Sequence, residues 1–189
     1  MKKKNIININ SGTYKYNTFF IPSSCNIRPT SKRIKIKLFN FLKKKIKNSI
    51  CLDLFSGTGS LSFELSSLGA KKVFNVEKNF KIANVLKKNM KKITSKRIFL
   101  YNLGAKYFLL NTYQKFDFIF LDPPYNINIL DNSIKIILKR NLLLDSGTIY
   151  IELNNLYFFK DRYKNLYVQA IEKIGNTFIC LLKYKRKKN

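Results

Sequence analysis

Residues 50–69, ICLDLFSGTGSLSFELSSLG, contain the pattern that decides the fold of this 189-residue chain. The stretch begins with a short apolar run typical of a buried strand. It continues through a loop with two glycines and then through a helical segment that Gly69 would end. A strand, a tight loop and a helix form the repeating unit of sheets with parallel strands, so we expect residues 50–69 to be one such unit.

The same alternation continues on the C-terminal side of this unit. Further strands are expected at 71–77, 97–102, 115–122 and 147–153, and helices at 79–93, 105–113 and 132–143. The last two apolar segments, 165–175 and 177–188, instead read as an antiparallel hairpin joined by the sequence GN. The pattern predicts an α/β fold with a doubly wound, mostly parallel sheet, in which ligands bind at the carboxyl ends of the strands.

The N-terminal part of the chain has a different character. Residues 1–30 alternate short polar and apolar pieces and predict a small arm or hairpin, ahead of a single domain at 31–189. A helix should follow immediately, capped by Thr30 or Ser31. Its apolar face is expected to carry four side chains at helical spacing. These are Ile34, Leu38, Phe41 and Leu42.

Charge is the outlying property of the composition. The chain has 37 lysines and arginines against 10 aspartates and glutamates, a formal net charge of +27. Part of this excess fits AT-rich codon usage, because lysine, asparagine, isoleucine, phenylalanine and tyrosine are all abundant. The remainder indicates a polyanionic partner, although charge alone does not separate RNA from DNA or a membrane surface.

The absent residue types exclude several kinds of site. The chain has no histidine, which excludes serine triads, histidine acid-base chemistry and most zinc sites. Its three isolated cysteines have no metal-binding spacing and indicate reduced thiols. No stretch has the length of a secretory signal or a membrane helix. We therefore expect a cytoplasmic protein that binds neither metal nor membrane.

The loop after the strand at 50–55 has the properties of a cofactor site. Gly57 and Gly59 allow a tight turn and close approach of a ligand, and the next helix offers free N–H groups. Glu77, twenty positions beyond Gly57, suits the hydroxyls of a ribose. Ser62 stands where a dinucleotide site would have a third glycine, which disfavours a nicotinamide cofactor and favours S-adenosylmethionine. A glycine turn that serves packing alone is the alternative.

The sequence DPPY at 122–125 follows the strand at 115–122 directly. Pro123 and Pro124 stiffen the loop and leave its carbonyl groups free to accept hydrogen bonds. Asp122 and a neighbouring carbonyl could hold both hydrogens of an exocyclic amino group, while Tyr125 stacks on an extruded base. The alternative is an ordinary turn at the end of a strand.

The ordered motifs RPTSKRIKIKLFNFL, LDLFSGTGSLSFEL, VEKN, FDFIFLDPPY and GTIYIEL resemble the RsmD family of bacterial rRNA guanine-N2 methyltransferases over residues 9–185. The resemblance implies a class I methyltransferase fold with a seven-stranded sheet. It implies S-adenosylmethionine as cofactor and methylation of one guanine N2 in 16S rRNA, within a small-subunit particle, by a monomer.

The resemblance also implies roles for residues. Asp122, Pro123, Pro124 and Tyr125 would hold the guanine amino group. The cofactor would lie against Asp53, Phe55, Ser56, Gly57, Thr58, Gly59, Ser60, Glu77, Asn102, Gly104 and Ala105. Arg28, Thr30 and Arg33 would contact RNA or close over the site. Relatives often have an acid or amide where this chain has Gly104, so adenine recognition departs from the family pattern here.

Two other functions fit parts of the sequence. A DNA adenine-N6 methyltransferase uses a similar loop but usually needs a separate target-recognition domain, for which this chain has no room. A non-catalytic RNA-binding assembly factor on the same fold is disfavoured because the glycine loop, Glu77 and the DPPY sequence are all intact.

Overall fold

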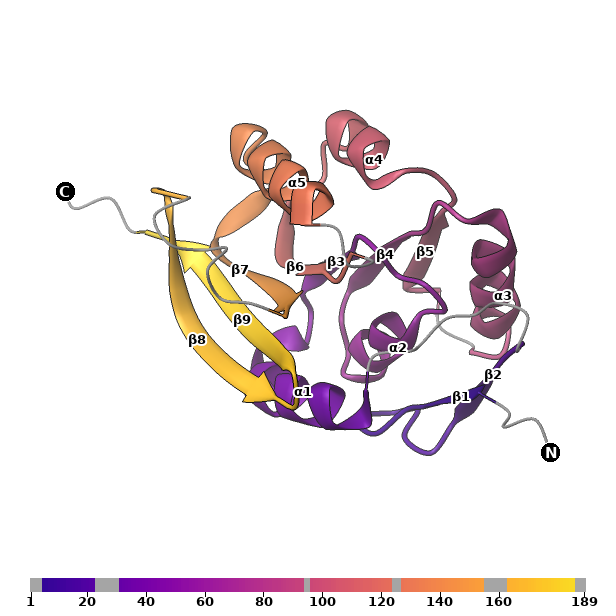
Figure 1. The fold of residues 1–189 in the computed structure, drawn as a ribbon. Helices are drawn as coiled ribbons and strands as arrows, with labels where there is room; N and C mark the ends of the chain where they lie inside the picture. Colours follow the sequence, from indigo (N-terminus) through magenta and orange to yellow (C-terminus); the bar gives the residue numbers. More distant parts are fainter. Residues whose placement is uncertain (1–4, 23–30, 94–95, 124–126, 155–162, 186–189) are drawn as a thin grey trace.

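The structure is a computed structural model that describes residues 5–22, 31–93, 96–123, 127–154 and 163–185. A seven-stranded sheet with the order β5-β4-β3-β6-β7-β9-β8 forms its centre (Figure 1). The strands are β3 (Ile50–Asp53), β4 (Lys72–Val76), β5 (Ile98–Tyr101), β6 (Phe116–Leu121), β7 (Leu143–Leu153), β8 (Leu166–Ile174) and β9 (Thr177–Tyr184).

β3 to β7 are parallel, and β9 runs in the opposite direction between β7 and β8. β3 lies between β4 and β6, and β6 continues the parallel order to β7. β9 pairs antiparallel with both β7 and β8, and the turn between β8 and β9 contains Gly175 at φ +61°. The α/β fold with a mostly parallel seven-stranded sheet and a C-terminal hairpin is therefore confirmed.

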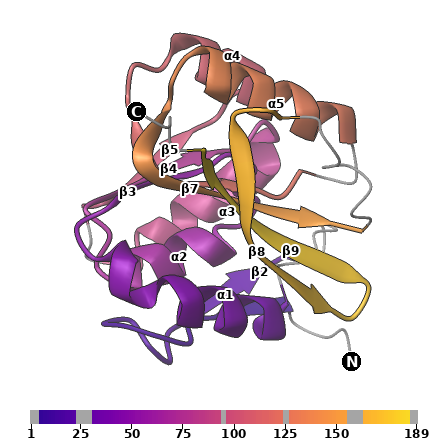
Figure 2. The ribbon, with the colours of Figure 1, turned by 90° about the vertical axis from the view of Figure 1, so that its left-hand side faces the viewer.

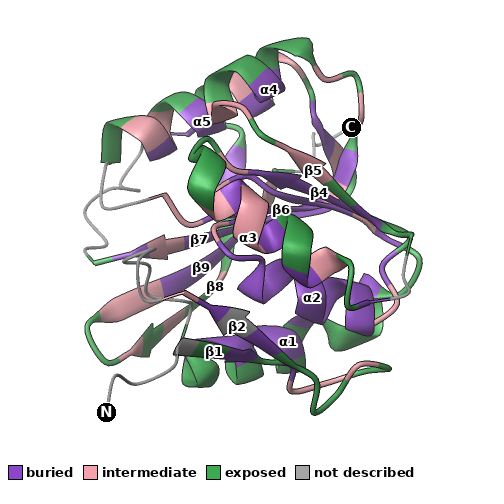
Figure 3. Ribbon diagram, turned by 90° about the vertical axis from the view of Figure 1, so that its right-hand side faces the viewer, coloured by how far each residue is buried: buried purple, intermediate pink, exposed green. Residues whose placement is uncertain are grey.

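Helices cover both faces of the sheet (Figure 1). One face carries α1 (Lys32–Ile46), α2 (Ser60–Ser67) and α3 (Phe80–Met90). The other carries α4 (Ala105–Asn111) and α5 (Ile127–Lys139). Each layer encloses its own hydrophobic core, and alternate side chains of the central strands enter one core or the other. Figure 3 shows that α2 is the innermost helix, with all eight of its residues buried.

Two details of the helices differ from the sequence prediction. Ser31 caps α1 as expected, but Phe41 is 60% exposed and Phe39 is buried instead. At 3.6 residues per turn, Phe41 lies roughly 100° from the centre of the buried stripe, which excludes it from the core.

Helix α5 spans Ile127–Lys139 instead of the expected 132–143. Leu130 extends the buried stripe of Ile134 and Ile137 toward the N-terminus, and Asn141, at φ +50°, follows the end of the helix shortly before β7.

The N-terminal segment forms a separate two-stranded antiparallel sheet. β1 (Asn5–Asn8) pairs with β2 (Thr18–Ile21), and Ile7 and Phe19 enter the core shared with α1 and α2. Phe19 stacks on Phe63 of α2 with ring centroids 4.3 Å apart. Figure 2 shows this small sheet near α1, on the opposite side of the central sheet from α4 and α5.

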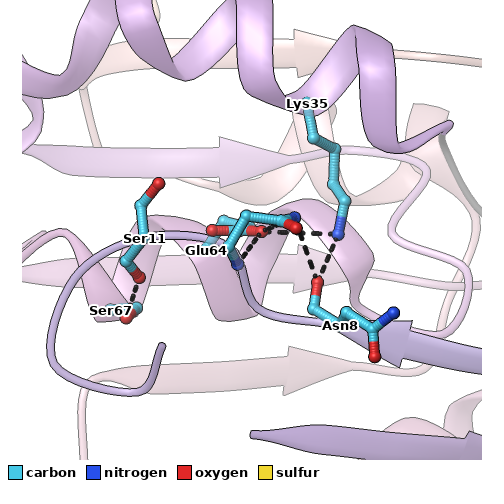
Figure 4. Close-up of polar contacts among 6 residues, drawn as sticks. Asn8, Ser11, Lys35, Glu64 and Ser67 are labelled. Carbon is cyan, nitrogen blue, oxygen red and sulfur yellow. Dashed lines mark hydrogen bonds and ion pairs between the residues drawn. The ribbon is translucent and has the colours of Figure 1, made fainter. Parts of the chain in front are cut away.

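A buried polar network attaches this small sheet to α1 and α2 (Figure 4). The Oε1 atom of Glu64 accepts hydrogen bonds from the backbone N and Nδ2 of Asn10, at 2.8 and 2.7 Å. Lys35 Nζ lies 3.4 Å from the same oxygen and donates to the carbonyl of Asn8 at 2.7 Å. Lys35 is 4% exposed and Glu64 is fully buried, so two charged groups are matched inside the protein.

The turn that follows β1 packs against the C-terminal end of α2. Ser67 Oγ donates to the carbonyl of Ser11 (Figure 4). It also accepts a hydrogen bond from the backbone N of Tyr14. Gly12 has φ +78°, and a Cβ atom there would lie 2.0 Å from the carbonyl oxygen of Ser67. Only glycine fits at this point of the turn.

Three further features of the described ranges concern membrane spans, metal sites and cysteines. None of their helices combines the length and apolar character that a bilayer-spanning helix needs. They contain no group of three or more side chains placed to hold a metal ion. Cys51 and Cys180 are free, buried thiols.

The Lys35–Glu64 pair should matter to stability more than a surface pair does. Lys35→Met leaves the Glu64 carboxylate buried without its cation, and we expect a loss of about 3–5 kcal/mol in the free energy of unfolding. Lys37→Met is the matched control, because Lys37 lies at the surface of the same helix and pairs there with Glu172 of β8. That change should cost about 1 kcal/mol or less. Urea denaturation measures both, and equal costs would contradict the role given to the buried pair.

Candidate active site

Acidic side chains gather where four neighbouring parallel strands end. Asp53 ends β3, Glu77 follows β4, Asp122 follows β6, and Glu152 lies near the end of β7. The charges of Asp122 and Glu77 both act on Asp53, and those of Asp122 and Asp53 both act on Glu152. The strand order therefore brings together residues that are 99 positions apart in sequence, at the edge where ligands of such sheets bind.

The glycine loop connects β3 to α2. Gly57 and Gly59 both have positive φ, +52° and +89°, and Gly59 is the N-cap of α2. A Cβ atom on Gly59 would lie 2.5 Å from Leu86 Cδ1, so this glycine is required for packing against α3. A Cβ atom on Gly57 would have nothing within 4 Å, so its absence leaves open space beside the loop.

Glu77 ties the loop to the end of β4. Its Oε2 accepts a hydrogen bond from the backbone N of Gly57 at 3.1 Å, and its Oε1 accepts from that of Asn79 at 2.7 Å. Ser56 reinforces the link, because its backbone N and its hydroxyl both donate to the carbonyl of Val76. The predicted carboxylate is thus fixed next to the predicted glycine loop, and Glu77 remains half-buried.

The other predicted cofactor residues lie around this loop or after β5. Thr58 and Ser60 are buried, and Phe55 is half-buried against the core that α4 and α5 cover. Asn102 donates from Nδ2 to the carbonyl of Glu77 at 2.7 Å, so its amide joins the ends of β4 and β5. Gly104 is the N-cap of α4 and Ala105 begins that helix.

Asp53 is held inside the protein by a residue that the sequence prediction did not assign to the site. Ser62 of α2 is fully buried, donates to Asp53 Oδ2 at 2.7 Å and also contacts Asn75 Oδ1. Burial is the main cause that raises the pKa of Asp53 to about 7, and the Ser62 hydrogen bond opposes it. The sequence did contain a signal for this contact, because a serine in place of the third glycine of the loop can reach the acid that precedes the loop.

Asp122 and Pro123 form the described part of the DPPY sequence. Asp122 is half-buried, and burial raises its pKa to about 6. Pro124, Tyr125, Arg28 and Thr30 were predicted site residues and lie outside the described residues.

Arg33 is the described member of the predicted nucleic-acid residues. It is exposed in the first turn of α1, beside the exposed Lys32. Its guanidinium is therefore available to a ligand outside the core.

Tyr150 and Glu152 are site residues that sequence reasoning missed. Tyr150 Oη donates to Glu152 Oε1 at 2.6 Å. Burial and the charge of Asp122 raise the pKa of Glu152 to about 8. Burial and the charge of Glu152 also raise the pKa of Tyr150 well above its usual value. The signal was an acid inside the otherwise apolar sequence GTIYIEL, where it lies at the ligand-binding end of a strand.

A hollow of about 150 Å³ lies beside the start of α2. Ser60 reaches it from α2, Lys35 from α1 and Asn8 from β1. Ser60 Oγ is buried and has no hydrogen-bond partner in the part of the chain that the structure describes. A buried hydroxyl without a partner and the open space at Gly57 are the properties expected of a loop that receives a polar ligand.

The raised pKa of Asp53 predicts how stability depends on pH. Above the ordinary pKa near 3.8, the unfolded chain has released a proton that the folded protein keeps until about pH 7. Asp53 therefore favours folding at low pH, and this advantage is lost as the pH rises toward 7. The chain has no histidine to mask the effect. Urea unfolding at several pH values tests this. As the pH rises from about 5 to 7.5, the free energy of unfolding of Asp53→Asn should increase by about 1–3 kcal/mol relative to that of the original protein. If the two proteins show the same dependence of unfolding free energy on pH, the prediction is wrong.

Known proteins match this chain over most of its length. The model of the family described as Conserved hypothetical protein 95 matches residues 7–183. The ribosomal RNA small subunit methyltransferase D of Haemophilus influenzae is 37% identical over 153 residues, which cover 79% of each chain. The protein of the same name from Buchnera aphidicola subsp. Baizongia pistaciae is 36% identical over 159 residues, 82% of this chain and 81% of the relative.

A solved structure agrees with these sequence matches. The putative methyltransferase yhhF from Escherichia coli superimposes with a TM-score of 0.88 at 23% identity, covering 97% of this chain and 100% of the other. This likeness supports the fold that the described strands and helices already define. The resemblance to the RsmD family is confirmed, and the chain belongs to the Conserved hypothetical protein 95 family.

Proposed function

We propose that this protein transfers a methyl group from S-adenosylmethionine to the exocyclic N2 amino group of a guanine in small-subunit ribosomal RNA. The observation that carries the proposal is the position of Asp122, which follows β6 directly beside the glycine loop of β3. An acceptor for an amino group and a cofactor loop thus lie at one edge of the sheet. The names of the matched relatives support an rRNA substrate.

The described residues fit S-adenosylmethionine. Glu77 offers its carboxylate to a ribose, and the open side of Gly57 admits a ligand close to the backbone. The free hydroxyl of Ser60 suits the polar amino-acid end of the cofactor. When bound, this cofactor supplies a methyl group on a positively charged sulfur, so the protein needs neither a metal nor a covalent intermediate for the transfer.

The protein's own contribution is to orient the amino group. Asp122 would accept a hydrogen bond from one amino hydrogen, and a carbonyl of the following loop would accept the other. This arrangement fixes the direction of the nitrogen lone pair toward the methyl group, and such alignment supplies much of the catalysis. The same carboxylate would accept the proton that the nitrogen must lose. Tyr125 is proposed to stack on the extruded base.

The partner is proposed to be 16S rRNA within a small-subunit particle, bound by a monomer in the cytoplasm. The charge of +27 favours a polyanion, since each neutralised phosphate releases counterions. Arg28, Thr30 and Arg33 are proposed to contact the RNA. Arg33 is exposed on α1, on the same face of the sheet as the side chain of Asp53, which bonds to α2.

The experiment that tests the proposal follows labelled methyl from S-adenosylmethionine into three substrates. These are naked small-subunit rRNA, small subunits that lack the modification, and duplex DNA. Label in N2-methylguanine from rRNA or subunits is the expected result. Label in N6-methyladenine from DNA would favour the alternative enzyme. Cofactor binding without any transfer would favour the non-catalytic assembly factor.

Asp122→Ala should separate catalysis from cofactor binding. The change removes the acceptor for the amino group but none of the residues assigned to the cofactor. We expect methyl transfer to fall by about 10²–10⁴-fold, with the cofactor Kd changed only a few-fold by calorimetry. Asp145→Ala, at an exposed acid of β7, is the matched control and should leave both values unchanged. Loss of cofactor binding in Asp122→Ala would mean that this loop has a different role.

The two glycines of the cofactor loop should respond differently to the same substitution. Gly57→Ala places a methyl group in the open space, so it should cost about 1–2 kcal/mol for the positive φ yet weaken cofactor binding at least about tenfold. Gly59→Ala must displace buried Leu86 and Phe63 and should cost roughly 2–4 kcal/mol. Urea unfolding and calorimetry measure the two effects. Unimpaired cofactor binding in a folded Gly57→Ala protein would exclude this loop as the binding site.

A further inference from the structure

Glu152 lies beside Asp122 on the next strand of the sheet. β6 and β7 are parallel, and Leu121 pairs with Ile151, so Asp122, which follows β6, comes next to Glu152 of β7. Phe120 and Tyr150 form the pair before, with ring centroids 5.6 Å apart, and belong to the core that α1 and α2 cover. Side chains alternate along a strand, so Glu152 points to this same face, and the charge of Asp122 acts on both Glu152 and Tyr150.

The carboxyl group of Glu152 is held in one orientation. The hydroxyl of Tyr150, a side chain that is 99% buried, binds its Oε1, and β7 itself lies between β6 and β9. Within the described ranges, Glu152 Oε2 has no hydrogen-bond partner and Glu152 forms no salt bridge. One oxygen is therefore fixed and the other is left for a donor at the ligand-binding edge of the sheet.

An uncompensated acid in this position is costly. The chain has 37 basic residues, yet none that the structure describes forms a salt bridge with Asp53, Asp122 or Glu152. Burial and the charge of Asp122 raise the pKa of Glu152, and the hydrogen bond from Tyr150 opposes them. A second donor, from a ligand N–H group, would lower this pKa further and favour the ionised, accepting carboxylate. The pair of acids thus fits a neutral ligand that presents several donors side by side.

Guanine presents such a set of donors along its Watson–Crick edge. Its N2 amino group carries two hydrogens and the adjacent N1 carries a third, whereas adenine has an acceptor at N1. Neighbouring strands lie about 4.8 Å apart, which suits two acceptors for adjacent groups of one base. We infer that Glu152 selects guanine by accepting a hydrogen bond from its N1–H group while Asp122 holds the N2 amino group. This inference rests on the proposed function and adds a specificity-determining residue to it.

The test changes the hydrogen-bonding groups on both sides of this contact. Once nucleoside analysis has located the methylated guanine, an RNA fragment or reconstituted subunit is made with either guanine or 2-aminopurine at that position. 2-Aminopurine keeps the amino group, has an acceptor at N1 and lacks the O6 atom of guanine, so the variant at position 152 is needed to assign the effect to N1. We expect kcat/KM of the original protein to fall about 10–100-fold with 2-aminopurine, as the loss of a charge-assisted hydrogen bond predicts.

Glu152→Gln should remove this discrimination. Its amide can donate to the N1 of 2-aminopurine, so the ratio of kcat/KM between the two bases should approach one, with the cofactor Kd unchanged. Glu172→Gln, at a glutamate of β8 paired with Lys37, is the matched control and should keep the original ratio. Tyr150→Phe is a second variant, which keeps the acid but removes its donor, and should lower the ratio partway.

The possible outcomes distinguish a failure of this inference from a failure of the proposed methyl transfer. If the original protein methylates guanine but treats both bases equally, or if Glu152→Gln lowers both rates by the same factor, Glu152 does not read N1 and the proposed function stands. If Glu152→Gln fails to fold, an unchanged ratio in Tyr150→Phe overturns the inference in the same way. If the original protein forms no N2-methylguanine at all, the proposed function fails and this inference fails with it.

Discussion

The parallel pairing of β3, β6 and β7 is the constraint on which the other features of the site depend. Because these strands run in one direction and lie side by side, Asp53, Asp122 and Glu152 meet at one edge and on one face. Burial then raises the pKa of each acid, which means that the folded protein holds them at a cost in free energy. Two hydrophobic cores, one on each face of the same strands, offset that cost.

Helix α2 links this edge to the N-terminal sheet. Its N-cap is the second glycine of the cofactor loop, its Ser62 holds Asp53, and its Glu64 holds Asn10 and Lys35. A helix with no exposed residue cannot shift without disturbing every one of these contacts. The N-terminal sheet, the start of α1 and the acid that precedes the cofactor loop are therefore all bonded to buried polar groups of one helix.

Sequence reasoning captured the elements that have strong local signals. The strand–helix alternation, the cap at Ser31 and the turn at Gly175 all follow from periodicity or from turn chemistry. It placed Phe41 wrongly because a stripe of four positions leaves the orientation of a helix uncertain until its neighbours are known. It missed Ser62 and Glu152 because their roles arise from contacts between elements, which neither spacing nor composition specifies.

The distribution of charge gives the site a sign opposite to that of the chain. Four of the ten acidic residues act on one another at this edge, while the chain as a whole carries +27. Positive charge outside the site attracts the phosphates of a nucleic acid, whereas buried carboxyl groups repel any phosphate that approaches them. On the proposed function, the backbone of the RNA would remain at the rim and a neutral base would enter. The acids that would hold the amino group would then also favour an extruded base over a paired one. Only an extruded base can reach these acids while its phosphate stays at the rim of the site.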